Sequence, residues 1–96
     1  MRVMARITVP VEAGNKAMQE DRIGPAMQRI VERWKPEALY CVLFEGKRGM
    51  YMVFDLPDAS GASEFCEPLF RELNAEVDIA PAMTAEDLQK GLSALG

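Results

Sequence analysis

Histidine is absent from the 96 residues of this chain. Its absence excludes Ser-His-Asp and Cys-His nucleophilic schemes, His-ligated haem and the usual mononuclear zinc or iron sites. Any acid–base chemistry would have to use carboxylates, tyrosine, lysine or cysteine. The chain also lacks the glycine pattern of dinucleotide-binding loops. We therefore expect neither a metal nor a bound cofactor.

Basic clusters and long apolar runs are also missing. The net charge is −4, and the largest basic cluster is Lys47-Arg48, which we interpret as a solubilising turn. Binding to a nucleic-acid backbone needs a basic footprint, so we expect no nucleic-acid partner. No apolar run approaches the roughly 20 residues that span a bilayer, and Arg6 interrupts the apolar region that a signal peptide would need. We expect a cytoplasmic protein with no membrane partner.

Cysteine is scarce, and its spacing carries no metal or redox motif. The chain has two cysteines, Cys41 and Cys66, and no Cys-x-x-Cys pair. Isolated cysteines usually behave as small hydrophobic residues, so we predict two free, buried thiols. We interpret the seven methionines as flexible core filling, and Trp34 as an anchor of the core.

The stretch from Glu37 to Leu56 is predicted to be a β-hairpin, because both arms are rich in β-branched and aromatic residues. We expect a four-residue turn, Gly46-Lys47-Arg48-Gly49, with Glu45 paired to Met50. Side chains alternate across a strand, so each face of the hairpin is apolar. One face takes Leu39, Cys41, Leu43, Met50, Met52 and Phe54. The other takes Tyr40, Val42, Phe44, Tyr51, Val53 and Asp55.

Further strands and helices flank the hairpin. Alternation of apolar and polar residues predicts strands over 2–9 and 75–80. Apolar residues at helical spacing predict a helix from Gly14-Asn15 to Trp34 and a short terminal helix after Thr84. Between them we predict a second long helix, ending at Asn74, with a buried stripe of Phe65, Leu69, Phe70 and Leu73.

Prolines and caps are expected to set the limits of these helices. Gly24-Pro25 should kink the first helix or divide it in two, and Pro68 should break the second, because proline removes a backbone donor and clashes with the preceding turn. Lys35-Pro36 should end the first helix. The segment from Thr84 to Asp87 resembles a capping box, with aspartate in place of the preferred glutamate or glutamine.

This order of elements predicts a single α+β domain over residues 1–96. It is that of a ferredoxin-like βαββαβ fold, with a four-stranded antiparallel sheet, the helices on one face and an extra C-terminal helix. The other face, with Tyr40, Val42, Phe44, Tyr51 and Val53, would then stay bare. Such an apolar patch is larger than monomers usually expose, so we expect a homodimer that packs two of these faces together.

With this order of elements, the chain resembles the dimeric α+β barrel superfamily, which includes small antibiotic-biosynthesis monooxygenases and muconolactone isomerases. It is also similar to a family of small uncharacterised bacterial proteins, through Pro36-Glu37-Ala38-Leu39-Tyr40, the Gly46-Lys47-Arg48 turn and Glu67-Pro68-Leu69-Phe70. The resemblance implies a dimeric barrel and assigns no catalytic residue. The superfamily's haem-binding and chlorite-degrading relatives depend on a histidine ligand, which this chain lacks.

Polar residues on the bare face are the candidates for a site. Strand parity places Arg6 on the same side as Tyr40, Tyr51, Asp55 and Asp78. In one interpretation this side lines a pocket inside a dimeric barrel. Arg6, Tyr40 and Tyr51 would bind an anionic or aromatic molecule there, and Asp55 and Asp78 would be candidate catalytic bases.

In the other interpretation, Arg6 forms a structural ion pair with Asp78 or Glu76. The residues therefore leave two functions open. The first is a homodimeric barrel that handles a small anionic or aromatic molecule without a cofactor, and the sequence does not decide whether it is an enzyme. The alternative is a non-catalytic interaction or regulatory domain whose interior is filled by its own side chains.

Overall fold

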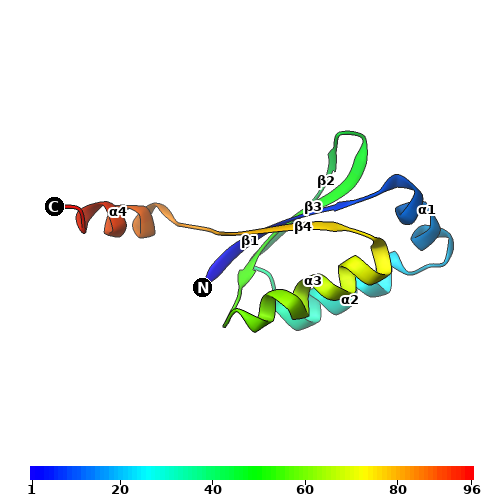
Figure 1. The fold of residues 1–96 in the computed structure, drawn as a ribbon, viewed down its shortest axis with the longest axis horizontal. Coiled ribbons are helices and arrows are strands. Elements are labelled where there is room, and N and C mark those ends of the chain that lie inside the picture. The colour runs from blue at the N-terminus through cyan, green and yellow to red at the C-terminus, as the bar shows by residue number, and fades with distance from the viewer.

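The computed structural model describes residues 1–96 as a four-stranded antiparallel sheet with four helices (Figure 1). The elements are β1 (Arg2–Val9), α1 (Val11–Gln19), α2 (Ile23–Trp34), β2 (Ala38–Phe44), β3 (Lys47–Asp55), α3 (Ser60–Leu73), β4 (Glu76–Pro81) and α4 (Ala85–Ser93). The strand order is β2-β3-β1-β4. The α+β class is therefore confirmed. The order is not strictly βαββαβ, because the first crossover contains two helices and α4 follows β4.

The core lies between one face of the sheet and the helices α2 and α3 (Figure 1). These two helices lie side by side, joined by the ion pairs Arg29–Glu72 and Arg33–Glu64. The alternating residues Val3, Ala5, Ile7 and Val9 of β1 are all buried, as their spacing predicts. Trp34 closes the end of α2 and packs edge-on against Phe54 and Phe65, with ring centroids 5.3 and 5.7 Å away. The prediction that Trp34 anchors the core is confirmed.

The hairpin turn is shorter than predicted. It consists of Glu45 and Gly46, both with positive φ (48° and 79°), which is the dihedral pattern of a type I′ turn. Cys41 therefore pairs with Met50, and the predicted pairing of Glu45 with Met50 is wrong. The observed register differs from the predicted one by an even number of residues. Because side chains alternate with a period of two, the predicted division into two faces is still correct.

The break in the first helical segment lies earlier than Gly24-Pro25. The chain leaves α1 and turns at Asp21, which has a φ of 52°, before α2 begins at Ile23. Pro25 then lies in the first turn of α2, where a missing backbone N–H costs no helical hydrogen bond. The segment forms two helices, one of the two outcomes we expected. It begins at Val11 and not at Gly14, with Pro10 at the N-cap position.

The predicted break at Pro68 is wrong, because α3 runs through this residue without interruption. Phe65 and Leu69 on either side of it are buried against the sheet, and this packing holds the helix together despite the lost donor. Phe70 is also corrected, since it is 42% exposed and lies one position off the buried stripe. Asn74 ends the helix with a φ of 53°, as predicted.

The terminal helix α4 projects away from the sheet and the other helices (Figure 1), and the molecule measures 55 × 27 × 18 Å. Its predicted capping box is present, with the Thr84 side chain and the Asp87 side chain each accepting from the other's backbone N–H at 3.0 Å. None of its residues is buried. Leu88 and Leu92 on the helix, and Leu95 just after it, are exposed. Neither α4 nor any other helix has the length and apolar character needed to cross a membrane.

Candidate functional site

The sheet face that points away from α2 and α3, which we call the open face, carries an arginine among apolar and aromatic side chains. Strand register places Arg6 directly between Tyr51 on β3 and Asp78 on β4, and places Tyr40 opposite Tyr51. No element of the chain covers these residues, and Tyr40 is 68% exposed. The predicted grouping of Arg6, Tyr40, Tyr51 and Asp78 on one face is therefore observed.

Arg6 interacts with an aromatic ring and not with a carboxylate. Its guanidinium carbon lies 4.4 Å from the centroid of the Phe44 ring, and Phe44 packs edge-on against Tyr51 at 5.1 Å. A cation over a ring face is attracted by the negative charge density of that face. Arg6 forms no ion pair with Asp78 or Glu76, although we considered both as partners.

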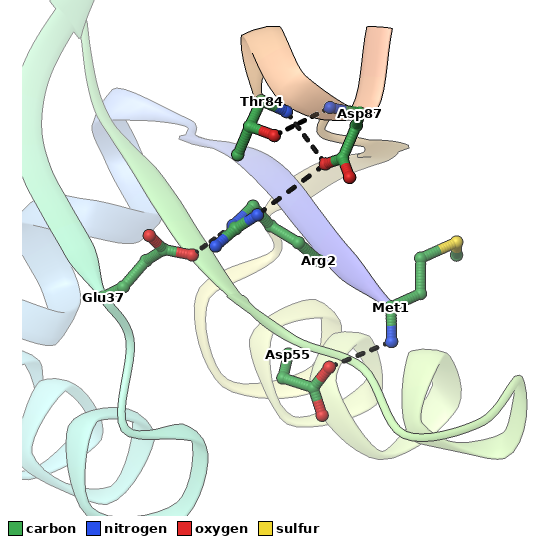
Figure 2. A network of polar contacts seen from close by, with 6 residues as sticks. All are labelled: Met1, Arg2, Glu37, Asp55, Thr84 and Asp87. Atoms are coloured by element: carbon green, nitrogen blue, oxygen red, sulfur yellow. Dashed lines mark hydrogen bonds and ion pairs between the residues drawn. The ribbon is translucent and has the colours of Figure 1, made fainter. Parts of the chain in front are cut away.

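Asp55 lies apart from this group. It pairs across the sheet with Arg2, and its carboxylate accepts from the amino group of Met1 at 2.9 Å (Figure 2). Tyr51, beside Arg6, is four residues back along β3, a separation of roughly 13 Å along the strand. Of the two candidate bases, Asp78 is the one beside Arg6.

A second polar group links the end of the sheet to α4 (Figure 2). Arg2 Nε donates to Glu37 Oε1 at 2.5 Å, and Arg2 Nη1 lies 3.9 Å from Asp87 Oδ2. The hydrogen bond from Thr84 N–H lowers the pKa of Asp87, and Glu37 raises the pKa of Arg2. Of these pairs, the one between Arg2 and Asp87 reaches α4. Because the side chains are exposed, the pairs contribute little to stability.

An apolar groove lies on the other side of the sheet, between α2 and the β2–β3 hairpin. Its volume is about 600 Å³, and twelve of its 14 lining residues are hydrophobic, including Met27 and Ile30 from α2 and Cys41 and Leu43 from β2. β2 is an edge strand, and Figure 1 shows the hairpin tip standing clear of the helices. Leu43 is accordingly 81% exposed.

The cysteines are placed differently from our prediction, although both are free. Cys41 is exposed in the groove, because the helices do not extend over the edge strand. Cys66 is half-buried in α3, and desolvation raises the pKa of its thiol, with a further rise from the charge of Glu67. The prediction of two buried thiols is therefore wrong for Cys41.

Arg48 borders the groove, although we predicted it to lie in a solubilising turn. Because the turn is short, Arg48 lies inside β3, on the same face of the strand as Met50. Its Nη2 donates to Asn15 Oδ1 at 3.0 Å, and it forms no ion pair. The arginines that do form ion pairs with carboxylates are Arg2, Arg22, Arg29, Arg33 and Arg71. Arg6 and Arg48 are thus the two arginines without a carboxylate partner.

No family model matches the chain, and no curated protein matches it. The structure establishes an α+β protein with a four-stranded antiparallel sheet. It contains no cluster of three or more cysteine, aspartate or glutamate side chains that could hold a metal ion. Two surfaces therefore remain as candidates for function: the open face around Arg6 and the groove beside Arg48.

Proposed function

We propose that the protein is a homodimer in which two open faces pack together and bind a small anionic or aromatic molecule between them, without a bound cofactor. The observation that supports this function is the state of Arg6, which lies on an uncovered aromatic face with no carboxylate partner. Covering Arg6 with a second sheet would remove its water. A buried charge without a counter-charge is too costly, so Arg6 in the dimer would need an anion beside it, either a bound ligand or a carboxylate such as Asp78.

The apolar character of the open face supports the dimer. Val42, Phe44, Tyr51 and Val53 are only partly buried within one chain, and burying an apolar side chain fully contributes about 1.5–3 kcal/mol. Several such side chains together offset the cost of association. The resemblance to dimeric α+β barrel proteins supports the same arrangement.

The chemistry of Arg6 favours a carboxylate or phenolate as the bound group. A guanidinium stays charged at physiological pH and binds these groups through two parallel hydrogen bonds. The Phe44 and Tyr51 rings beside it provide an apolar wall for an aromatic body. Asp78, next to Arg6 on β4, is in position to act as a base if the bound molecule reacts.

Assembly and binding can be tested together. We expect sedimentation velocity at micromolar concentration to give a dimer, and calorimetric titration to show binding of benzoate. Arg6→Lys should weaken benzoate binding by about tenfold, because lysine cannot reproduce the paired hydrogen bonds, and should leave the melting temperature unchanged. A monomer, or a variant that loses stability with unchanged affinity, would contradict the proposal.

The alternative function is a non-catalytic interaction domain, and α4 is the observation that favours it. Leu88 and Leu92 are exposed on a helix that its own chain leaves uncovered, and the exposed Leu95 follows just after that helix. In this case Arg6 would pair with Asp78 of the second copy, and the dimer interior would be solid. A crystal structure of the dimer separates the two functions, because ligand binding needs an interior cavity of about 300 Å³ or more.

A further inference from the structure

We infer that the groove between α2 and the β2–β3 hairpin binds a small monocarboxylate with an apolar body, and that Arg48 holds its carboxylate. This site lies on the helix side of the sheet and is formed by a single chain. It is therefore separate from the open face and does not depend on the dimer proposed above.

The size and lining of the groove suit a small apolar ligand. Ligand sites typically enclose about 300–1,000 Å³, and this groove measures about 600 Å³. Its floor is well packed, since Ile7 is 2% exposed and Met50 is 6% exposed. Its rim is not, because Leu43 is 81% exposed and Cys41 is also exposed. Filling the groove would remove this apolar rim from water, which favours binding.

Arg48 gives the groove a single charge. It is the one charged residue among the 14 that line the groove, and no carboxylate lies within ion-pair distance of it. The guanidinium group has five N–H donors, and one of them is used by Asn15 Oδ1. The remaining donors can bind a carboxylate in the paired geometry that arginine favours. The groove thus combines an apolar body with one anion-binding end.

Helix α1 positions the guanidinium. Asn15 holds Nη2, and the absence of a side chain at Gly14 lets Nη1 lie against the helix. A Cβ atom at Gly14 would lie 2.6 Å from Nη1 of Arg48. Because that atom is the far end of a flexible side chain, Gly14→Ala would displace the guanidinium with little effect on the fold. This substitution tests the position of the charge without removing it.

The methionine methyl groups provide the readout. Met27 and Met50 line the groove, whereas Met4 lies on the open face and Met83 precedes α4. We would label the methionine methyls with ¹³C and titrate the full chain with decanoate, using decanol as the uncharged control. We expect decanoate to shift Met27 and Met50 but not Met83, and a shift at Met4 would report separately on the open face. We also expect it to bind about tenfold more tightly than decanol, which is the value of a charge-assisted hydrogen bond.

Variants assign the effect to Arg48. Arg48→Gln should remove the difference between decanoate and decanol, and Gly14→Ala should reduce it. Arg71→Gln, which removes an exposed arginine that does not line the groove, should leave it unchanged. If Arg48→Gln does not fold, decanoate protection of Cys41 against iodoacetamide in the unmodified protein gives a second measurement, because Cys41 lines the groove.

Three results would overturn the inference. Equal affinity for decanoate and decanol would mean that the groove is only an apolar surface. Shifts at Met4 that disappear in Arg6→Gln, with no shift at Met27 or Met50, would place the ligand on the open face and not in the groove. Shifts at Met27 that grow with protein concentration and resist decanoate would show that a second copy fills the groove. A monomer that still binds decanoate in the groove would contradict the proposed dimer alone.

Discussion

Arg6 and Phe44 are in contact although strand β3 lies between their own strands, β1 and β2. The contact is possible because Gly49 of β3 has no side chain. A Cβ atom at Gly49 would lie 2.6 Å from Cδ2 of Phe44 and 3.0 Å from the backbone oxygen of Ile7. Gly49 thus leaves the space in which the Phe44 ring reaches across the sheet to the Arg6 guanidinium.

Gly49→Ala is therefore expected to destabilise the protein. The new methyl group has to displace the Phe44 ring, and the backbone of Ile7 cannot move away easily. Overpacking of this kind costs about 1–3 kcal/mol in the free energy of unfolding. Urea denaturation followed by Trp34 fluorescence would measure it.

Gly24→Ala is the matched control for this prediction. A Cβ atom at Gly24 meets nothing within 4 Å, and the residue lies in the first turn of α2. Alanine favours helix over glycine by up to about 1 kcal/mol, so this variant should be as stable as the unmodified protein or slightly more stable. Equal losses in the two variants would mean that the space beside Phe44 is not the cause.

Val53→Asp is expected to prevent assembly through the open face. Val53 lies on this face, between Met4 on β1 and Ala38 on β2. In a dimer that covers the face, the new carboxylate would be buried without a partner, which is strongly unfavourable. Sedimentation velocity should show a monomer.

Val31→Asp makes the same substitution on the outer side of α2, where Val31 is 45% exposed. This variant should remain a dimer. If Val31→Asp also becomes monomeric, or if both variants remain dimeric, the open face is not the contact surface.

Local sequence patterns predicted most of the fold because burial alternates regularly in the central strand. In β1 every second residue is buried, so the alternation of apolar residues in the sequence predicted both the ends of the strand and its two faces. The position of the hairpin turn was not predicted correctly, because Glu45 adopts a positive φ that is uncommon for residues other than glycine. The even shift in register kept each side chain on its predicted face.

The groove could not be predicted in the same way. Whether Cys41 and Leu43 are covered depends on where α2 crosses the sheet, and no local pattern encodes that position. Arg48 was misplaced for a related reason, since the two glycines at 46 and 49 allowed two different turns. The shared face of Arg6, Tyr40, Tyr51 and Asp78 was predicted correctly because it depends on strand parity alone. Parity does not give the position along a strand, and Asp55 lies apart from them. The role of Arg6 there remains a prediction.

The capping box of α4 should depend on pH. The hydrogen bond that the Thr84 backbone N–H donates lowers the pKa of Asp87, so the folded helix favours the charged carboxylate. The contribution of Asp87 is then complete above the pKa of an unfolded aspartate, about 3.9, and is lost as the pH falls through the lower pKa of the folded state. We expect the ¹³Cα shifts of α4 to stay helical down to about pH 4 and to approach random-coil values below it.

Asp87→Asn is the control, because asparagine cannot carry the charge that interacts with Arg2 and with the helix dipole. Its α4 should be partly frayed at neutral pH and should change little on acidification. A helix that melts with the same midpoint in this variant would assign the titration to another carboxylate.

The two cysteines should differ in reactivity. The thiolate is the nucleophile in alkylation. Burial raises the pKa of Cys66, so less of it is ionised at pH 8, whereas Cys41 is exposed on the edge strand. We expect iodoacetamide to modify Cys41 about tenfold faster than Cys66, as measured by mass spectrometry of the intact protein and its peptides. Cys41→Ser should retain only the slow phase, and Cys66→Ser only the fast one.

The concentration dependence of the Cys41 rate reports on how two copies meet. Cys41 points to the helix side of the sheet, so a dimer through the open face leaves its thiol accessible. Its alkylation rate should then be the same below and above the concentration at which dimers form. A dimer that instead extends the sheet through the edge strand β2 would bring a second backbone beside Cys41. Protection of Cys41 that increases with protein concentration would therefore favour edge pairing over packing of the open faces.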